Sequence, residues 1–317
     1  MSGSSFPIGA AGQAWGDEER ATWAARAGVA RRSYAEEVLA KLELLKDRFD
    51  IVQYGALSQD PARYPLFCIK TRGFDPGNGK PCVLVTGGVH GYETSGVQGA
   101  LLFATEMGEY AAHFNVLVCP CVSPWGYECI QRWNVKAVDP NRCFGPHAIS
   151  PAEEADALSK LVAHMAVPQW TMHMDLHETT NTDNSEFVPA KAARDGVDLE
   201  ILDIPDGFYL VGDRENPQAT WHTAIIDAVR IVTHLAPANA RGEIIDCPCT
   251  QEGVSVVAAL ACGLCSGITN AVYATTTEVY PDSETNPMTA QQCVTVQVTA
   301  VTAGLAWIVA NAGSAGT

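Results

Sequence analysis

Hydrophobic positions along the chain fall into short apolar runs that alternate with stretches of helical period. The central runs are nearly free of charge and are bounded by turn residues, the pattern of strands buried on both faces. The expected strands cover residues 50–54, 64–70, 82–89, 115–122, 170–176 and 271–279. The expected helices cover residues 96–110, 151–165, 219–235 and 289–312. Strands that alternate with helices predict an α/β fold with a largely parallel sheet covered on both sides.

The remaining stretches give weaker patterns. Residues 1–48 are expected to be a helical lead-in, because charged residues alternate with Ala, Leu and Val at helical spacing over residues 20–46. Residues 178–213 are expected to be irregular, and residues 244–263 give no pattern from which to predict structure. Since no repeat, low-complexity segment or long linker divides the sequence, we expect residues 1–317 to form a single domain.

The two ends of the chain are expected to carry neither a secretion signal nor a membrane span. The first 16 residues lack both a basic start and an apolar run of signal-peptide length. We expect no charge-free apolar segment of the roughly 18 to 20 residues that a membrane span requires. The nearest candidate, residues 294–310, is rich in threonine and fits a buried terminal helix better. A cytoplasmic protein with no membrane partner is the expectation that follows.

Composition narrows the function classes. The chain has 317 residues, of which 47% are hydrophobic, so it can bury a large core without a structural metal or disulfides. Asp and Glu number 36 against 20 Lys and Arg, which gives a net charge of −16. No basic run offsets this negative field, so nucleic acid and acidic membrane surfaces are poor partners. Because the core needs no structural metal, any metal that the chain holds is expected to take part in catalysis.

The eleven cysteines offer an alternative kind of metal site. Without a secretion signal they are expected to be reduced. Cys262 and Cys265 form a C-x-x-C pair, but no second pair completes a zinc ribbon. A redox or structural-zinc role for the pair is left as the minor alternative to small buried core residues.

Two motifs place histidine and glutamate at the ends of predicted strands. His90 and Glu93 follow the run at 82–89 within Gly-Gly-Val-His-Gly-Tyr-Glu, and His177 ends the run at 170–176. Active-site residues of parallel sheets gather past the carboxyl ends of the strands, so these side chains are expected to meet. Two histidines and one glutamate are the ligand set of a catalytic zinc whose fourth position is left to water.

Two further motifs supply the other groups that hydrolysis needs. Glu278 follows a run of β-forming residues, and a buried glutamate beside a metal could take the proton from attacking water. Arg132 and Arg142 are cations in a strongly acidic protein, and the second belongs to the sequence Asp139-Pro-Asn141-Arg142. Arginines beside a metal site favour a substrate carboxylate or a developing oxyanion.

Together these motifs resemble the zinc metallocarboxypeptidase (carboxypeptidase A-like) family, including its aspartoacylase and succinylglutamate desuccinylase branch. The resemblance covers about residues 81–280, two thirds of the chain. It implies a three-layer α/β/α sandwich around a mixed, mostly parallel sheet of about eight strands. Two features are more similar to the deacylase branch: the 87-residue spacing between the histidines and the sequence Asp-Leu-His-x-Thr-Thr.

The resemblance also implies a role for each matching residue. His90, Glu93 and His177 would bind one zinc ion per chain, and Glu278 would be the general base. Arg132 would polarise the scissile carbonyl and stabilise the oxyanion. The remaining matches are Asn141 and Arg142, which would hold the substrate carboxylate, and Asp139, which would accept a hydrogen bond from the first zinc histidine.

The family's mobile tyrosine has no counterpart in the segment Cys247–Gly253, which leaves Tyr273 and Tyr280 as candidates for its role. The main hypothesis is a zinc-dependent metallocarboxypeptidase that cleaves an amide bond next to a free C-terminal carboxylate of a peptide. An N-acyl amino acid deacylase is the alternative, and a non-catalytic binding protein on the same scaffold is a third reading.

Overall fold

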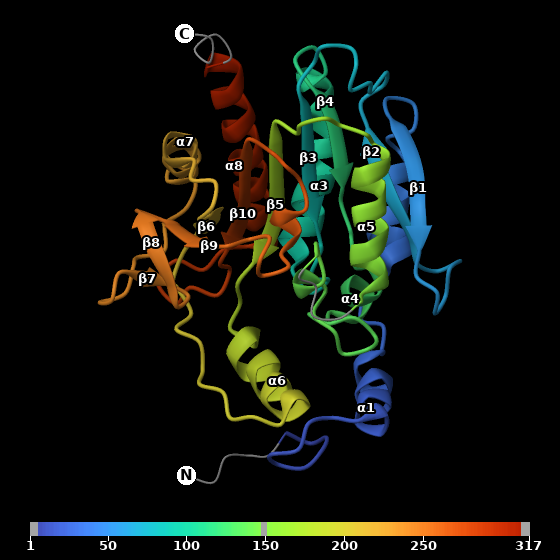
Figure 1. Ribbon diagram of the computed structural model, residues 1–317, viewed down its shortest axis with the longest axis vertical. Coiled ribbons are helices and arrows are strands. Elements are labelled where there is room, and N and C mark those ends of the chain that lie inside the picture. Colours follow the sequence, from blue (N-terminus) through green and yellow to red (C-terminus); the bar gives the residue numbers. More distant parts are fainter. Residues whose placement is uncertain (1–5, 147–150, 312–317) are drawn as a thin grey trace.

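The computed structural model describes residues 6–146 and 151–311, and these surround one sheet of ten strands (Figure 1). The strands are β1 (Asp50–Ala56), β2 (Pro65–Lys70), β3 (Cys82–Gly87), β4 (Asn115–Cys119), β5 (Met172–Glu178), β6 (Tyr209–Asp213), β7 (Glu243–Ile244), β8 (Cys247–Gln251), β9 (Val254–Val257) and β10 (Tyr273–Val279). Their order across the sheet is β1-β2-β4-β3-β5-β10-β6-β9-β8-β7.

The sheet is mixed, as the family resemblance implies. Its four central strands, β4, β3, β5 and β10, run parallel to one another. Antiparallel strands flank them on both sides, with β2 pairing β4 and β6 pairing β10. The count rises from the expected eight to ten because short strands form within residues 209–213 and 243–257, for which no strand was predicted.

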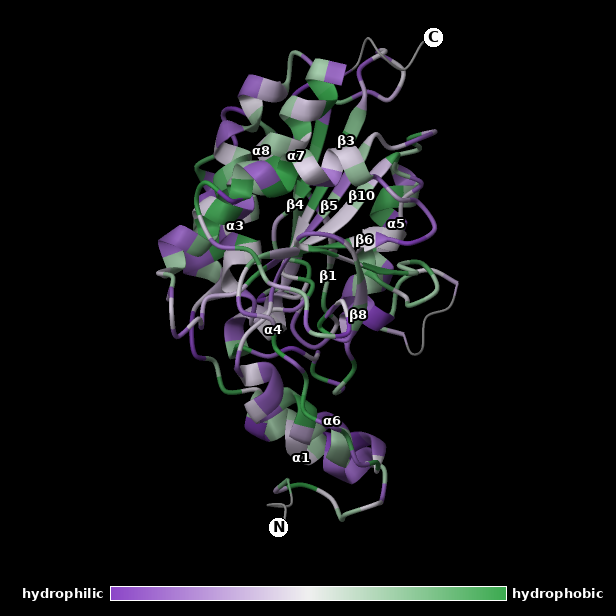
Figure 2. Cartoon of the chain, turned by 90° about the vertical axis from the view of Figure 1, so that its left-hand side faces the viewer, coloured by the Kyte–Doolittle hydropathy of each residue, from purple (hydrophilic) through white to green (hydrophobic). Residues whose placement is uncertain are grey.

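Helices cover both faces of the sheet, which confirms the predicted α/β architecture. The helices are α1 (Asp17–Ala27), α2 (Ala40–Glu43), α3 (Thr94–Glu106), α4 (Pro124–Cys129), α5 (Glu153–His164), α6 (Val188–Asp195), α7 (Ala219–Val229) and α8 (Ala290–Asn311). Short π or 3-10 segments lie at η1 (Ala35–Leu39), η2 (Met107–Tyr110), η3 (Pro140–Arg142), η4 (Asp183–Phe187) and η5 (Cys265–Gly267). Figure 2 shows α3, α7 and α8 on one face and α5 on the other.

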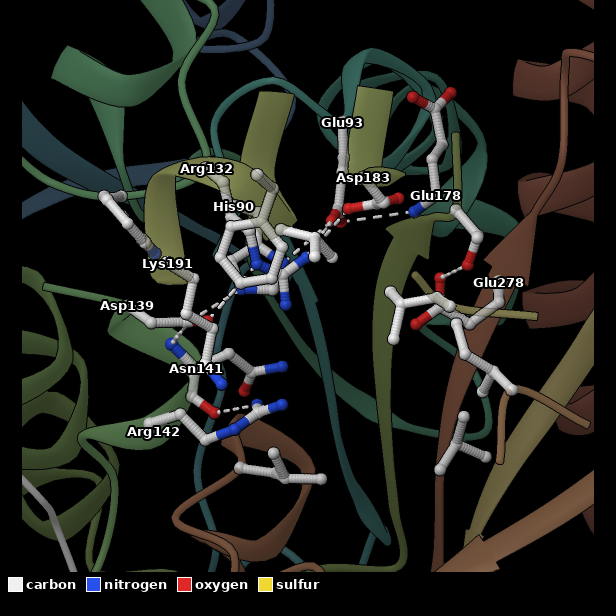
Figure 3. Close-up of a pocket in the computed structure, with 18 of the residues that line it drawn as sticks. His90, Glu93, Arg132, Asp139, Asn141, Arg142, Glu178, Asp183, Lys191 and Glu278 are labelled. Carbon is white, nitrogen blue, oxygen red and sulfur yellow. Dashed lines mark hydrogen bonds and ion pairs between the residues drawn. The ribbon is translucent and has the colours of Figure 1, made fainter. Parts of the chain in front are cut away.

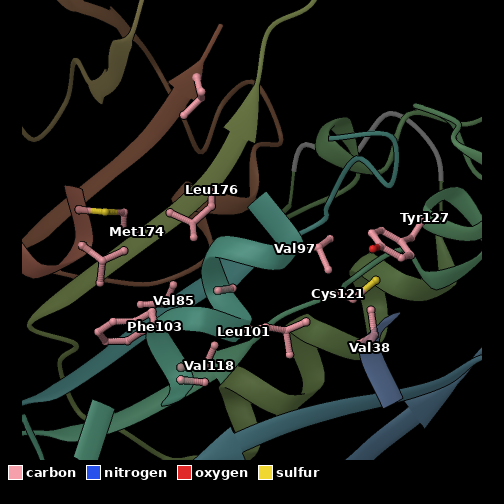
Figure 4. Close-up of a cluster of buried hydrophobic side chains, with 14 of the residues drawn as sticks. Val38, Val85, Val97, Leu101, Phe103, Val118, Cys121, Tyr127, Met174 and Leu176 are labelled. Atoms are coloured by element: carbon pink, nitrogen blue, oxygen red, sulfur yellow. The ribbon is translucent and has the colours of Figure 1, made fainter. Parts of the chain in front are cut away.

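The central strands β3 and β4 are largely apolar because they meet a core on each face. In β3, Val83 and Val85 belong to the cluster under α3 and α8, while Cys82 and Leu84 belong to the cluster under α5. Figure 4 shows the first cluster, in which residues of α3 pack against β3, β4 and β5. Strands buried in this way lack polar alternation, which is why their run was readable in the sequence.

The close approach of α3 to the sheet depends on a glycine. A Cβ atom on Gly96 would clash with the carbonyl oxygen of Leu176, so only glycine lets the first turn of α3 lie against β5. This contact brings the loop that carries the first sequence motif beside the end of β5.

The C-terminal helix α8 packs against α3 and α7. Contrary to expectation, it is long and apolar enough to cross a membrane by length and composition, since none of its 22 residues is charged. More than half of its most apolar window is buried inside the fold, which confirms the prediction of a buried terminal helix.

Several predicted elements have different bounds. The lead-in is two helical pieces, α1 and the η1–α2 segment, separated after Gly28; residues 1–5 of this prediction, like Ala312 of the closing helix, lie outside the described residues. The stretch 178–213, expected to be irregular, contains η4, α6 and β6. Helix α6 lies beside α1 beyond the carboxyl ends of the central strands (Figure 1).

Candidate metal centre

His90, Glu93 and His177 meet at the carboxyl edge of the central strands. His90 and Glu93 lie in the loop between β3 and α3, and His177 lies near the end of β5. One potential ligand atom from each falls within 4.8 Å of the other two, and all three residues are buried. Glu93 separates the rings, with Oε1 2.7 Å from His90 Nδ1 and Oε2 2.6 Å from His177 Nδ1. Both Nδ1 atoms therefore face one carboxylate.

The opposite nitrogen of each ring faces a second carboxylate. His90 Nε2 lies 2.9 Å from Asp139 Oδ1, and His177 Nε2 lies 2.7 Å from Asp175 Oδ2. Carboxylates only accept hydrogen bonds, so a ring whose Nδ1 bound a metal beside Glu93 would keep its proton on Nε2, facing Asp139 or Asp175. Asp139 therefore contacts His90, the histidine expected to be its partner, and Asp175 makes the matching contact with His177.

The electrostatics of the cluster favour a cation. Burial by itself would raise the pKa of Glu93, but His177 and His90 hold it below its usual range. Burial by itself would lower the pKa of His177, but Asp175 and Glu93 raise it well above its usual range. The carboxylates of Glu93, Asp139 and Asp175 thus concentrate negative charge that a divalent ion between the Nδ1 atoms would offset. Within the described residues, these three are the one group of metal-ligand side chains this close together.

Glu278 extends the same edge from β10. It is the register partner of His177 on the adjacent parallel strand, and its Oε2 accepts a hydrogen bond of 3.0 Å from Thr179 Oγ1. Because that bond uses the one hydroxyl proton of Thr179, Tyr209 OH donates to Thr179 Oγ1 across 2.7 Å. Burial raises the pKa of Glu278 to about 8, with His177 opposing and Glu93 adding to the effect.

Arg132 lies on the other side of the pocket among acidic groups (Figure 3). Its Nε donates to Asp139 Oδ2 across 3.2 Å, and its Nη1 is 3.5 Å from Asp183 Oδ1 and 3.8 Å from Glu93 Oε1. Its guanidinium also stacks on the ring of Phe187 at 4.3 Å. These contacts hold a cation within reach of the cluster in a fixed orientation.

Asn141 and Arg142 follow Asp139 in the 3-10 segment η3. Asn141 Oδ1 accepts from the backbone N–H of Cys265, which turns its amide nitrogen toward His177 Nε2 at 3.4 Å. The guanidinium of Arg142 donates to the Asn141 carbonyl oxygen but has no carboxylate within 4.0 Å among the described residues. It is therefore a cation left available at the pocket.

Apart from His177 and Asp175, which lie beneath it, these side chains line one cavity of about 980 Å³. The end of η4 and helix α6 supply part of its wall through Phe187 from η4 and Val188 and Lys191 from α6. Lys191 is half-buried and, like Arg142, forms no ion pair within the part of the chain that the structure describes. Figure 3 draws Lys191 among the lining side chains.

The sequence analysis missed several of these residues. Asp183, Phe187 and Lys191 lie in the stretch read as irregular, where the interrupted helix η4–α6 hides the period. Tyr209 was missed because β6 is only five residues long. Asp175, by contrast, is predictable from the sequence as a partner of His177, since it shares a strand face with that histidine two residues away.

The structure places the two candidate tyrosines away from the cavity. Tyr273 packs between Trp221 and Trp307, with ring centroids 5.4 Å from each. Tyr280 OH donates to Asn181 Oδ1 across 3.0 Å. Among the described residues that line the cavity, Tyr209 is the one tyrosine. It is fully buried and bonded to Thr179, so it sits as a fixed neighbour of Glu278.

The two members of the C-x-x-C pair lie in different environments. Cys262 is exposed, whereas Cys265 is buried with its Sγ 3.6 Å from Thr86 Oγ1. None of the eleven cysteines, all of which lie in the described residues, forms a disulfide bond. The reading of Cys265 as a small core residue fits this position.

Comparisons with known proteins agree with the fold. The profile of a family described as protein of unknown function, DUF2817, matches residues 69–254. No curated protein matches the sequence. A candidate metallopeptidase from Shewanella amazonensis SB2B is similar at 18% identity over 86% of this chain and 91% of that one, with a TM-score of 0.62.

Two carboxypeptidase-type structures are also similar. A metallo-carboxypeptidase from Burkholderia cenocepacia has 13% identity over 94% of this chain and 70% of that one, with a TM-score of 0.58. Bovine thrombin-activatable fibrinolysis inhibitor, solved with a tick carboxypeptidase inhibitor, has 13% identity over 90% of this chain and 99% of that one, with a TM-score of 0.57. At these identities the likeness establishes a metallocarboxypeptidase-like fold.

Proposed function

The chain belongs to the DUF2817 family and has a metallocarboxypeptidase-like fold, and from this premise we propose that it is a zinc-dependent hydrolase that cleaves an amide bond next to a free carboxylate. The observation that carries the proposal is the convergence of two Nδ1 atoms and one carboxylate beside the partly buried Glu278, next to one cavity. The peptide carboxypeptidase reaction is our first choice.

The donor set of His90, Glu93 and His177 fits zinc. Two imidazole nitrogens and one carboxylate are the ligands of catalytic zinc sites that keep an open position. Each imidazole is also held by a carboxylate on its other nitrogen, which fixes the ring for metal binding. Zinc bound there would polarise a substrate carbonyl and lower the pKa of water.

Glu278 is proposed as the general base. Its carboxylate projects from the strand next to His177, where it can take a proton from an attacking water and later give one to the leaving amine. Burial makes it a stronger base than an exposed glutamate, and the hydrogen bond from Thr179 fixes the position of Oε2.

Arg132 is proposed to stabilise the negative charge that develops on the substrate carbonyl oxygen. Its guanidinium is already oriented by Asp139 and Asp183, so it need not reorganise during the reaction. The cavity walls and Phe187 shield it from water, which strengthens its interaction with an oxyanion.

Asn141 and Arg142 are proposed to bind the free carboxylate of the substrate. The amide nitrogen of Asn141 and the unpaired guanidinium of Arg142 are adjacent donors in η3. Lys191 adds a second unpaired cation on the α6 wall. In a chain of net charge −16, unpaired cations at one cavity favour an anionic substrate.

A second candidate is hydrolysis of N-acyl amino acids. Two observations favour it: the Asp-Leu-His-x-Thr-Thr wording around His177, and the absence of a pocket-lining tyrosine in the segment where peptidases carry a mobile one. The tyrosine that does line the cavity, Tyr209, is buried in a strand.

Parallel assays separate the candidates. Zinc-loaded protein is incubated with N-blocked dipeptides and with N-acyl amino acids, and released amino acids are quantified. We expect turnover of the dipeptides. Turnover of only the N-acyl amino acids would support the deacylase instead. Absence of turnover on both panels, by protein that holds one zinc ion per chain, would support a binding protein and contradict the proposal.

A further inference from the structure

We propose that Thr86 and His173 are positioning residues that act through Asp175 to hold His177 in the tautomer required for metal binding. The inference rests on the metal site of the proposed function. It concerns a row of buried polar groups beneath that site, which the proposed reaction leaves without a role.

The row lies on one face of β5 and on the neighbouring strand. His173, Asp175 and His177 alternate along β5 and share the face opposite the core residues Met172, Met174 and Leu176. Thr86 on β3 is the register partner of Asp175. All four polar side chains are at most 1% exposed. Ionisable groups at three alternate positions of a buried strand are costly unless each is paired.

The hydrogen bonds between these groups have a single consistent direction. Thr86 Oγ1 donates its one proton to Asp175 Oδ1 across 2.6 Å. The contact of 3.1 Å between Thr86 Oγ1 and His173 Nε2 must then have His173 as the donor. Burial lowers the pKa of His173 to about 4, so its ring is neutral and Nδ1 accepts from Thr269 Oγ1 across 3.3 Å.

This series of hydrogen bonds ends at His177, a proposed metal ligand. Asp175 Oδ2 accepts from His177 Nε2 across 2.7 Å, while its other oxygen is occupied by Thr86. Because both oxygens of Asp175 are engaged, the carboxylate cannot rotate without breaking a buried hydrogen bond. His177 therefore keeps a proton on Nε2, and Nδ1, which faces Glu93 Oε2, is the nitrogen that would bind the metal.

The network is complete within the described residues. Three buried side-chain polar atoms in the described residues lack a hydrogen-bond partner. They are Tyr54 OH, Trp133 Nε1 and His222 Nε2, and none of them belongs to this hydrogen-bond network. Fully satisfied buried networks fix one arrangement, whereas the loss of one member leaves its neighbours unpaired. Thr86 is the link whose removal is least disruptive in volume, because valine has the same shape.

The test compares Thr86→Val with Thr86→Ser, which keeps the hydroxyl. Zinc affinity is measured by competition with a chromogenic chelator, and folding is checked by circular dichroism. We expect Thr86→Val to bind zinc roughly 10- to 100-fold more weakly and Thr86→Ser to keep the wild-type affinity. Wild-type affinity in Thr86→Val would overturn the inference. Failure of the wild-type protein itself to bind zinc would instead overturn the proposed function.

A second measurement needs no variant. Long-range ¹H–¹⁵N spectra of the zinc-loaded wild-type protein report which ring nitrogen of each histidine carries the proton. We expect the Nε2–H form for both His173 and His177. The Nδ1–H form of His173 would reverse the donor and acceptor roles in the hydrogen bond to Thr86. This result would overturn the inference even if Thr86→Val fails to fold.

Discussion

His177 on β5 and Glu278 on β10 are register partners on adjacent parallel strands, so a potential metal ligand and a partly buried carboxyl lie side by side at the same level of the sheet. We predict that Glu278→Gln binds zinc like the wild-type protein but loses roughly 10²- to 10⁴-fold in kcat, because the amide cannot accept the proton. Metal analysis and steady-state kinetics on the same preparation check this. The control is Glu252→Gln, an exposed surface glutamate paired with Arg230. Wild-type kcat in Glu278→Gln would assign the base to another residue.

The hydrogen bond from Thr179 contributes to the pKa of Glu278, the proposed base. It stabilises the carboxylate and so lowers a pKa that burial has raised to about 8. Thr179→Val removes the donor, and we expect the acid limb of kcat/KM to move roughly one pH unit upward. Thr179→Ser, which keeps the hydroxyl, should leave the profile in place. A downward shift, or none, in the valine variant would contradict this role.

The site was readable in sequence where its residues adjoin long, buried strands. His90 and His177 follow or end apolar runs, and the strand register then brings Glu278 beside His177. Such runs are distinctive because both faces of each strand are buried.

The remaining parts of the site depend on tertiary packing. The α6 wall follows a π segment and is only eight residues long, so no helical period builds up around Lys191. Tyr209 belongs to a five-residue strand that pairs with β10 across a long sequence separation. Strands this short lack a periodic signal, and their pairing partners cannot be read from local residues.

Arg142 should determine the preference for a free carboxylate. Removal of charge-assisted hydrogen bonds in Arg142→Met is expected to lower kcat/KM roughly 10- to 150-fold on substrates with a free carboxylate. The same substrates with an amide-capped C-terminus should be equally poor for the variant and for the wild type. Arg241→Met, at an exposed arginine paired with Glu243 and Asp246, is the control. If the variant still preferred the free carboxylate, another group would have to bind it.

Glu154 links stability to pH away from the site. Burial raises its pKa from 4.5 to about 7, so the folded state holds a proton that the unfolded chain releases. This stabilisation is complete below pH 4.5, and about 3 kcal/mol of it is lost as pH rises through 7. Glu154→Gln stays neutral, so the difference in unfolding free energy between variant and wild type should grow in its favour over this interval. Urea unfolding between pH 4.5 and 8 measures it.

The neighbouring Glu153 is the matched control for this effect. Hydrogen bonds from the side chain and backbone of Ser58 lower its pKa, so its ionised form is the stabilising one. Glu153→Gln should therefore lose stability above its pKa and should not reproduce the behaviour of Glu154→Gln. A difference curve for Glu154→Gln that is flat with pH would show that Glu154 is already ionised in the fold.

The central claim is that His90, Glu93 and His177 form a zinc site, and metal content tests it most directly. Purified protein is stripped with a chelator, re-equilibrated with zinc, desalted and analysed for metal per chain. We predict one zinc ion per chain in the wild type and in the exposed-histidine control His113→Ala, and none in His177→Ala. Wild-type protein that retains no zinc, or His177→Ala that retains one equivalent, would contradict the account.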